Sequence, residues 1–231
     1  MVSPQTLAFY NSTDEQTQNV MRNYISEGKT LKAIGWTKVY CEEDEDGNIT
    51  PITVGEAIKN IDSGISPAST VVGNPNNGKP NFTLYTMVGY DNYEPSLLFA
   101  YSIGKWSTGV AISDEFRPEK NYDDFMSIEW PTGYHINNEG GINGGSKYDS
   151  IYLHDISENT LIYGFKEGYG EIQVASLGYN KSASGKNKWT SHYIHTWRKS
   201  AATIAVGVPS GVTITGVDNN TSWQVASGVD F

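Results

Sequence analysis

Residues 82–112, FTLYTMVGYDNYEPSLLFAYSIGKWSTGVAI, contain three short apolar runs that are separated by the turn residues Asp91-Asn92 and Gly104-Lys105. Similar runs recur at intervals of about ten residues up to the C-terminus. They lie in residues 124–130, 150–154, 160–165, 171–179, 188–197, 201–208, 211–217 and 222–226. Evenly spaced short strands with no helical period between them predict an antiparallel β-sandwich, jelly-roll-like, over residues 82–231.

The composition of the whole chain favours the same fold class. Among its 231 residues, Ile and Val together number 34 and Leu only 8, and aromatic residues make up 12%. β-branched and aromatic side chains pack well on a pleated sheet, whereas Leu is among the better helix formers. The sequence therefore predicts a mainly β protein.

The N-terminal part has a different pattern, and its first element is predicted to be a helix. Residues 3–12 read as an irregular lead. Thr13 and Gln16 then form a capping box, with Thr13 as the N-cap. Val20, Met21, Tyr24 and Ile25 share one face, and Gly28 follows as a stop signal. This amphipathic helix needs a surface on which to dock.

A hairpin and a second helix are expected next. Residues 31–41 and 49–52 read as two strands around an Asp46-Gly47 turn. Thr53 and Glu56 form another capping box, which begins a short helix that ends near Gly64. Residues 65–81 are rich in Pro, Gly, Asn and Ser and read as a linker. We therefore expect an α+β appendage over residues 1–64, a linker over 65–81 and the sandwich over 82–231.

Charge and apolar content exclude several classes of partner. With 16 Lys and Arg residues and a net charge of −10, the chain lacks the basic face that nucleic acids or anionic membranes require. No apolar run approaches the length of about 18 residues that a transmembrane helix needs, and no signal peptide is visible. Cys41, the single cysteine, reads as a packed thiol. We expect a secreted protein in its mature form or a component of a virion surface.

An acidic run offers a weak metal-site hypothesis. Glu42, Asp44 and Asp46 occupy alternate positions, as in the calcium loop of an EF-hand with Gly47 at its sixth position. Thr53 stands at the twelfth position, where a bidentate Glu is needed, so a solvated hairpin tip is the favoured interpretation. His192 and His195 would lie on opposite faces of one strand and could not share a metal. No cofactor is expected.

Two carboxylates provide the one enzyme hypothesis. Glu129 and Glu171 each lie in a predicted strand, on the face opposite the large apolar residues. If one concave sheet carried both, a glycoside hydrolase would be consistent with the pattern. An ordinary wet face of an antiparallel sheet explains the same residues, so an enzyme is the less favoured class.

Aromatic residues interleaved with Asn and Asp favour a binding face instead. The candidates for ligand contact are Tyr85, Tyr101, Trp106, Trp130 and Tyr134. Flat amphipathic rings beside amides suit a glycan or a cell-surface protein, and a second copy of the chain is a further candidate partner. We therefore expect a non-catalytic extracellular or particle-surface binding or adhesion module, with a glycan as the first ligand to test.

The 200–217 segment supports an alternative. Ile204 and Val206 alternate with Thr203 and Ala205, and Val212, Ile214, Thr213 and Thr215 repeat the pattern after a Pro209-Ser210 turn. An uncharged hairpin with one apolar face could be inserted into a bilayer by a secreted β-pore-forming toxin. Its predicted arms of about eight residues are slightly short for a spanning strand.

Overall fold

The structure is a computed structural model. The residues that it describes are 4–43, 49–62, 81–92, 97–106, 124–129, 134–144, 150–157, 160–165, 171–180, 188–196, 203–207, 211–215 and 222–230. Most of them lie in antiparallel strands, which confirms the mainly β class. The strands are β1 (Lys29–Glu43), β2 (Ile49–Ile52), β3 (Phe82–Asp91), β4 (Leu97–Trp106), β5 (Asp124–Glu129), β6 (Tyr134–Gly144), β7 (Ser150–Ser157), β8 (Thr160–Phe165), β9 (Glu171–Asn180), β10 (Lys188–Thr196), β11 (Thr203–Gly207), β12 (Gly211–Thr215) and β13 (Ser222–Asp230).

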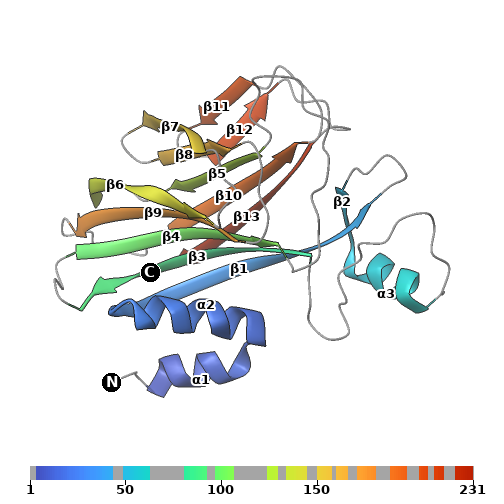
Figure 1. Cartoon of the computed structure of the whole chain (residues 1–231), viewed down its shortest axis with the longest axis horizontal. Coiled ribbons are helices and arrows are strands. Elements are labelled where there is room, and N and C mark those ends of the chain that lie inside the picture. The colour runs from blue at the N-terminus through green and yellow to red at the C-terminus, as the bar shows by residue number, and fades with distance from the viewer. Residues whose placement is uncertain are drawn as a thin grey trace.

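These strands form two large sheets and one separate hairpin (Figure 1). The six-stranded sheet has the order β2-β1-β3-β4-β9-β6, and the five-stranded sheet has the order β13-β10-β5-β8-β7. Strands β11 and β12 pair with each other. The chain crosses repeatedly between the two large sheets, so segments far apart in the sequence become neighbours.

Strand β1 belongs to the same sheet as the strands after residue 82. Its residues Lys29–Val39 pair antiparallel with β3, with one register shift between Leu31 and Ala33. The N-terminal segment and the C-terminal region therefore share a continuous hydrogen-bonded sheet. Of the predicted linker, residues 65–80 lie outside the described residues. Asn81 accepts a hydrogen bond from the Cys41 backbone N–H at 2.8 Å through its side-chain oxygen.

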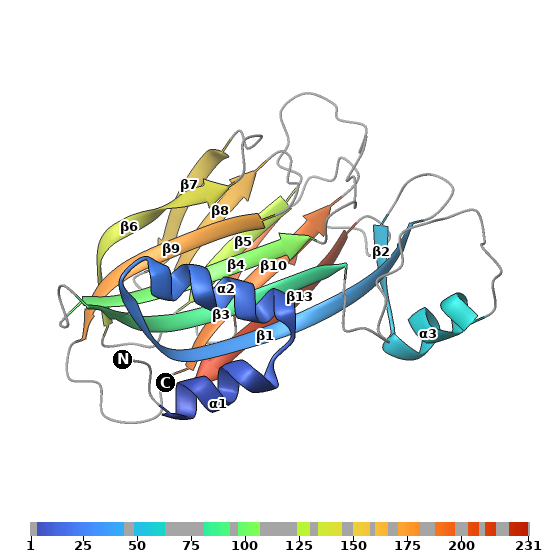
Figure 2. The same ribbon diagram turned by 60° about the horizontal axis from the view of Figure 1, so that its bottom comes forward.

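Helices α1 (Pro4–Ser12) and α2 (Glu15–Ser26) lie against one face of the six-stranded sheet (Figure 2). The prediction of an irregular lead over residues 3–12 is wrong, because Pro4 begins a helix there. A proline in the first turn has its φ angle preset for a helix and needs no partner for a missing N–H. Leu7 and Ala8 then favour the helical state.

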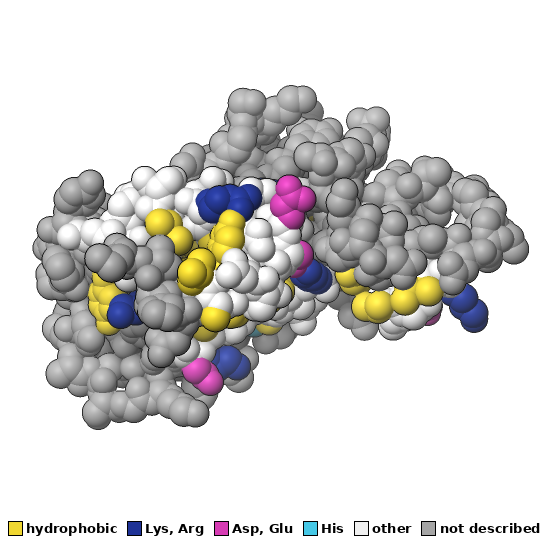
Figure 3. All heavy atoms as spheres, turned by 90° about the horizontal axis from the view of Figure 1, so that it is seen from below, with side chains coloured by type: hydrophobic (Ala, Val, Ile, Leu, Met, Phe, Trp, Pro, Cys, Tyr) yellow, Lys and Arg dark blue, Asp and Glu magenta, His cyan; other side chains and the backbone are white. Residues whose placement is uncertain are grey.

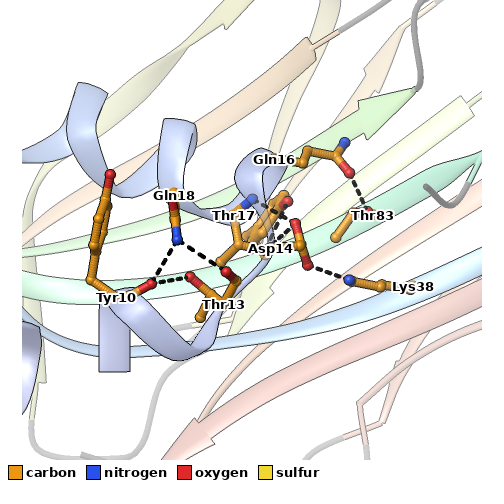
Figure 4. A network of polar contacts seen from close by, with 9 residues as sticks. Tyr10, Thr13, Asp14, Gln16, Thr17, Gln18, Lys38 and Thr83 are labelled. Atoms are coloured by element: carbon orange, nitrogen blue, oxygen red, sulfur yellow. Dashed lines mark hydrogen bonds and ion pairs between the residues drawn. The ribbon is translucent and has the colours of Figure 1, made fainter. Parts of the chain in front are cut away.

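The N-cap of α2 is Asp14 and not the predicted Thr13. The Asp14 carboxylate accepts a hydrogen bond from the Thr17 backbone N–H at 2.9 Å and forms an ion pair with Lys38 on β1 (Figure 4). Thr13 instead donates its hydroxyl to the Tyr10 carbonyl at 2.8 Å. A carboxylate at a helix N-terminus also interacts favourably with the helix dipole. Lys38 lies 24 residues further along the chain, so the sequence around Asp14 does not show that it will pair with this carboxylate.

We expect the substitution Asp14→Ala to lower the free energy of unfolding by about 1 kcal/mol, the usual value of an N-cap. Burial by itself raises the pKa of Asp14, but the hydrogen bonds from Lys38 and Thr17 outweigh it and hold that pKa below its ordinary value. The charge of Asp14 therefore stabilises the fold at neutral pH. This contribution is lost as the pH falls through the lowered pKa.

Urea unfolding of the wild type and of Asp14→Asn measures this effect, because asparagine retains the cap but carries no charge. The stability difference between the two proteins should shrink as the pH falls toward 3. A difference that stays constant with pH would contradict the role of the charge.

Two other predicted helix signals are confirmed. Gly28 follows α2 with a φ angle of 79°, a conformation that glycine adopts without strain. Helix α3 (Val54–Asp62) begins at the predicted capping box. The Thr53 backbone N–H donates to the Glu56 carboxylate at 2.8 Å, and the Glu56 N–H donates to the Thr53 hydroxyl at 3.2 Å.

Both faces of β3 and β4 are buried. Tyr85 and Met87 of β3, with Phe99, Tyr101 and Ile103 of β4, lie in one apolar cluster with Val20, Met21 and Tyr24 of α2. The side chains of Phe82 and Thr86, at alternate positions of β3, point to the other side, toward β10 of the five-stranded sheet. There, the Thr86 hydroxyl and the Ser191 hydroxyl are 2.9 Å apart, and the Phe82 and Tyr193 rings stack with centroids 4.2 Å apart. Strands β3 and β4 thus lie between α2 on one face and β10 on the other.

Strands β1 and β13 approach each other closely where the two sheets meet. A Cβ atom added to Gly35 would lie 2.2 Å from the backbone oxygen of Gly228. Beside it, the Thr37 hydroxyl donates to the Ala226 carbonyl at 2.7 Å. β13 is an edge strand of its sheet, and unpaired edges tend to recruit other strands. The hydrogen bond from Thr37 therefore satisfies the Ala226 carbonyl, which could otherwise accept a bond from another strand.

Candidate functional site

The structure places three of the five predicted ligand-contact aromatics in the core. Tyr85 is 0% exposed, Tyr101 5% and Trp106 1%. The Trp106 indole N–H donates to the Tyr193 hydroxyl at 3.2 Å, and the Tyr85 hydroxyl lies 3.5 Å from that of Thr17. Their rings therefore do not form an exposed stacking face. Trp130 lies outside the described residues, and Tyr134 is described only by its backbone, at the start of β6.

The two candidate catalytic carboxylates lie in different sheets. Glu129 ends β5 of the five-stranded sheet, where it pairs with Thr190 and Thr160. Glu171 begins β9 of the six-stranded sheet, where it pairs with Lys105. The premise that one sheet carries both carboxylates is therefore wrong. Spacing along the sequence does not show to which sheet a strand belongs.

The metal-site and thiol predictions concern β1 and its turn. Glu42 pairs with Thr50 of β2, whereas Asp44 and Asp46 lie outside the described residues. Within the described ranges, no three His, Cys, Asp or Glu side chains gather to hold a metal ion. Cys41 is buried, as predicted. Loss of solvation raises the pKa of its thiol to about 12, so the reactive thiolate is scarce at neutral pH.

His192 and His195 lie on opposite faces of β10, as the spacing predicts. His195 is 0% exposed and packs between the rings of Trp106 and Trp223, with centroid distances of 5.5 and 5.4 Å. His192 is half-buried on the other face. Burial, and in second place the charge of Lys188, lower the pKa of His192, which favours the neutral imidazole.

Of the 200–217 segment, the structure describes residues 203–207 and 211–215, which pair antiparallel with the predicted apolar residues on one face. Ile204 lies opposite Ile214, Val206 opposite Val212 and Ala205 opposite Thr213. The described part of each arm is five residues long, and the other residues of the predicted arms lie outside the described residues. Among the described strands, β11 and β12 form a two-stranded sheet of their own.

Aromatic side chains that are partly open to solvent occur on α1 and β1. Phe9 and Trp36 are half-buried, with ring centroids 5.4 Å apart, and Leu7 nearby in sequence is 53% exposed. Tyr10 is half-buried, and the Arg22 guanidinium lies over its ring, 5.7 Å from the centroid. Seen from the side on which the two helices lie, Figure 3 shows hydrophobic side chains close to Lys or Arg.

The polar groups of this surface come from α2. Asn19, Arg22 and Asn23 are exposed, and their spacing of three and four residues places them on one side of the helix. Arg22 donates to the Asn19 side-chain oxygen and to the Tyr10 hydroxyl. The side-chain amide of Gln18 donates to the Tyr10 carbonyl at 3.0 Å and joins the two helices (Figure 4). We call Leu7, Phe9, Tyr10, Asn19, Arg22, Asn23 and Trp36 the α1–α2 surface.

The α1–α2 surface did not emerge from the sequence, because residues 3–12 read as irregular. Pro4 followed by Leu7 and Ala8 is the signal that could have indicated the helix. The position of Trp36 beside Phe9 depends on how α1 docks on β1, which local patterns do not contain.

Among the described helices, none combines the length and the apolar character needed to cross a membrane. No protein-family model matches the chain, and no curated protein matches its sequence.

Proposed function

We propose that the protein is a non-catalytic binding or adhesion module of the extracellular space or of a particle surface, and that its ligand is a glycan. The observation that carries this proposal is the α1–α2 surface, in which an exposed guanidinium and two exposed amides adjoin partly open aromatic rings. Aromatic rings pack against the apolar faces of sugar rings, and planar amide and guanidinium groups hydrogen-bond to hydroxyls.

The preorganisation of the α1–α2 surface supports the proposal. Arg22 is held over Tyr10 by two hydrogen-bond acceptors, so little side-chain entropy would be lost when a ligand binds. A guanidinium has five N–H donors, and three of them remain for a ligand after these two bonds. Tyr and Arg are also the residue types that binding sites concentrate.

We infer in addition that the two large sheets form a β-sandwich with jelly-roll-like connections. The hydrogen-bonded and stacked pairs between β3 and β10 support the face-to-face packing. The repeated crossing of the chain between the sheets supports the connections. In this fold, the helices that carry the α1–α2 surface pack against a sheet that is itself held by a second sheet.

A glycan array probed with the labelled full chain tests the proposed function. We expect retention on a subset of glycans without product formation, and at least a tenfold loss of affinity in the double variant Tyr10→Ala/Arg22→Ala. Gln224→Ala, at an exposed position on β13, serves as the matched control and should bind like the wild type.

Several results would overturn the proposal. They are the absence of binding to any glycan, unchanged binding by the double variant, and release of cleaved sugar. Dye release from lipid vesicles together with oligomer formation would favour membrane insertion of the 200–217 hairpin instead. Self-association without glycan binding would identify a second copy of the chain as the partner.

A further inference from the structure

Lys29, the first residue of β1, has its ammonium group among three aromatic rings. The Nζ atom lies 4.5 Å from the centroid of Tyr101, 4.9 Å from that of Phe99 and 5.4 Å from that of Tyr24. Tyr24 comes from α2, and the other two rings come from β4. A cation within about 6 Å of a ring centroid is attracted to the ring face, most strongly where solvent is excluded.

Hydrogen-bond acceptors complete the surroundings of this ammonium. Lys29 donates to the Glu27 carboxylate and to the Tyr101 hydroxyl. The Lys29 side chain is 11% exposed and that of Glu27 is 47% exposed, so the group opens to solvent beside the carboxylate. The Tyr24 and Tyr101 rings are perpendicular to each other, with centroids 5.2 Å apart, and hold two walls at a fixed angle.

We propose that Tyr24, Phe99, Tyr101 and Glu27 form an ammonium-binding cage whose ligand class is a primary alkylammonium, and that the chain fills this cage with its own Lys29. The two acceptors select a primary ammonium, because a quaternary one has no N–H to donate. The filled cage holds the C-terminal end of α2 against β4.

A second lysine on the same strand shows the difference between a cage and an ordinary contact. Among the described rings, Lys32 lies over that of Tyr90 alone, with Nζ 5.6 Å from the centroid, and Lys32 is exposed. Three rings and two acceptors converge on Lys29. Lys32 is therefore the matched control.

Chemical rescue of Lys29→Ala tests the cage. The substitution removes Cγ, Cδ, Cε and Nζ, and n-propylammonium contains this same set of heavy atoms. We expect n-propylammonium at millimolar concentration to raise the melting temperature of Lys29→Ala along a saturable curve. At equal ionic strength, 1-propanol and tetramethylammonium should not do so, and Lys32→Ala should show no saturable rise with any of the three.

Equal effects of n-propylammonium and 1-propanol, or equal rescue of Lys29→Ala and Lys32→Ala, would overturn the proposal. If Lys29→Ala does not fold, the wild type provides the test by nuclear magnetic resonance. Ring currents in the cage should move the Lys29 ε-methylene protons upfield of those of the exposed Lys59. Coincident shifts would contradict the cage. Both readouts are independent of glycan binding, so this inference and the proposed function can fail separately.

Discussion

Replacing Gly35 by valine is expected to lower the free energy of unfolding by about 3 kcal/mol or more, because the close contact between β1 and β13 has no room for a side chain. A Cβ atom at Gly35 would lie 2.2 Å from the oxygen of Gly228 and 3.0 Å from its carbonyl carbon. Both atoms belong to the backbone of a paired strand, so neither can turn away as a flexible side chain would. The two strands would have to separate, with loss of the neighbouring bond from Thr37 to Ala226.

Thermal or urea unfolding measures this effect, and Gly55→Ala provides the matched control. In α3, a Cβ atom at Gly55 would find its nearest neighbour, the Thr53 hydroxyl, at 3.9 Å. Alanine there should leave the stability unchanged or raise it by up to about 1 kcal/mol through its helix propensity. For Gly35→Val, a loss of 3 kcal/mol corresponds to a fall in melting temperature of roughly 6–12 °C. Equal melting temperatures for the two variants would refute the close approach of β1 and β13.

The substitution Trp106→Ala is expected to cost about 3–5 kcal/mol, the usual loss for a fully buried tryptophan. The indole of Trp106 packs against the rings of Phe82, Trp223 and His195, with centroid distances of 4.9, 5.9 and 5.5 Å. Removing it leaves a cavity at the inter-sheet contact and takes the hydrogen-bond donor from the Tyr193 hydroxyl.

This substitution also separates a core role for Trp106 from a ligand-binding role. Urea unfolding followed by circular dichroism should show the loss, whereas Leu7→Ala, at a side chain 53% exposed, should change stability by less than about 0.5 kcal/mol. A stable Trp106→Ala protein with impaired glycan binding would show that the indole faces a ligand.

The sequence placed Tyr85 and Tyr101 in strands but did not show that a helix covers them. Tyr85 and Tyr101 alternate with smaller residues along β3 and β4, a pattern that is consistent with a strand exposed on one face. Their burial results from α2, whose Val20, Met21 and Tyr24 cover that face. Whether a second layer covers a sheet depends on segments that are distant along the chain, so strand periodicity alone does not reveal it.

The helix caps show the same division between local and distant interactions. Both partners of the Thr53–Glu56 box lie within four residues, and the predicted hydrogen bonds are confirmed. At α2, Asp14 takes the N-cap position predicted for Thr13, and its carboxylate also pairs with Lys38 on β1. A capping motif in the sequence identifies the start of a helix to within about one residue. The ion pair, by contrast, exists only in the folded chain.

Local chemistry by itself indicated the mainly β class, the stop at Gly28 and the facing residues of the β11–β12 hairpin, because each depends on residues that are close along the chain. The turn predicted at Gly104-Lys105 is wrong, because pairing with β3 and β9 carries β4 through these residues to Trp106. The tertiary structure alone decided that Glu129 and Glu171 lie in different sheets, that α1 and α2 cover the sheet, and that Tyr10 meets Arg22. These arrangements depend on which buried surfaces pack together and on which strand edges pair. That choice minimises the free energy of the whole chain and leaves little trace in any short segment.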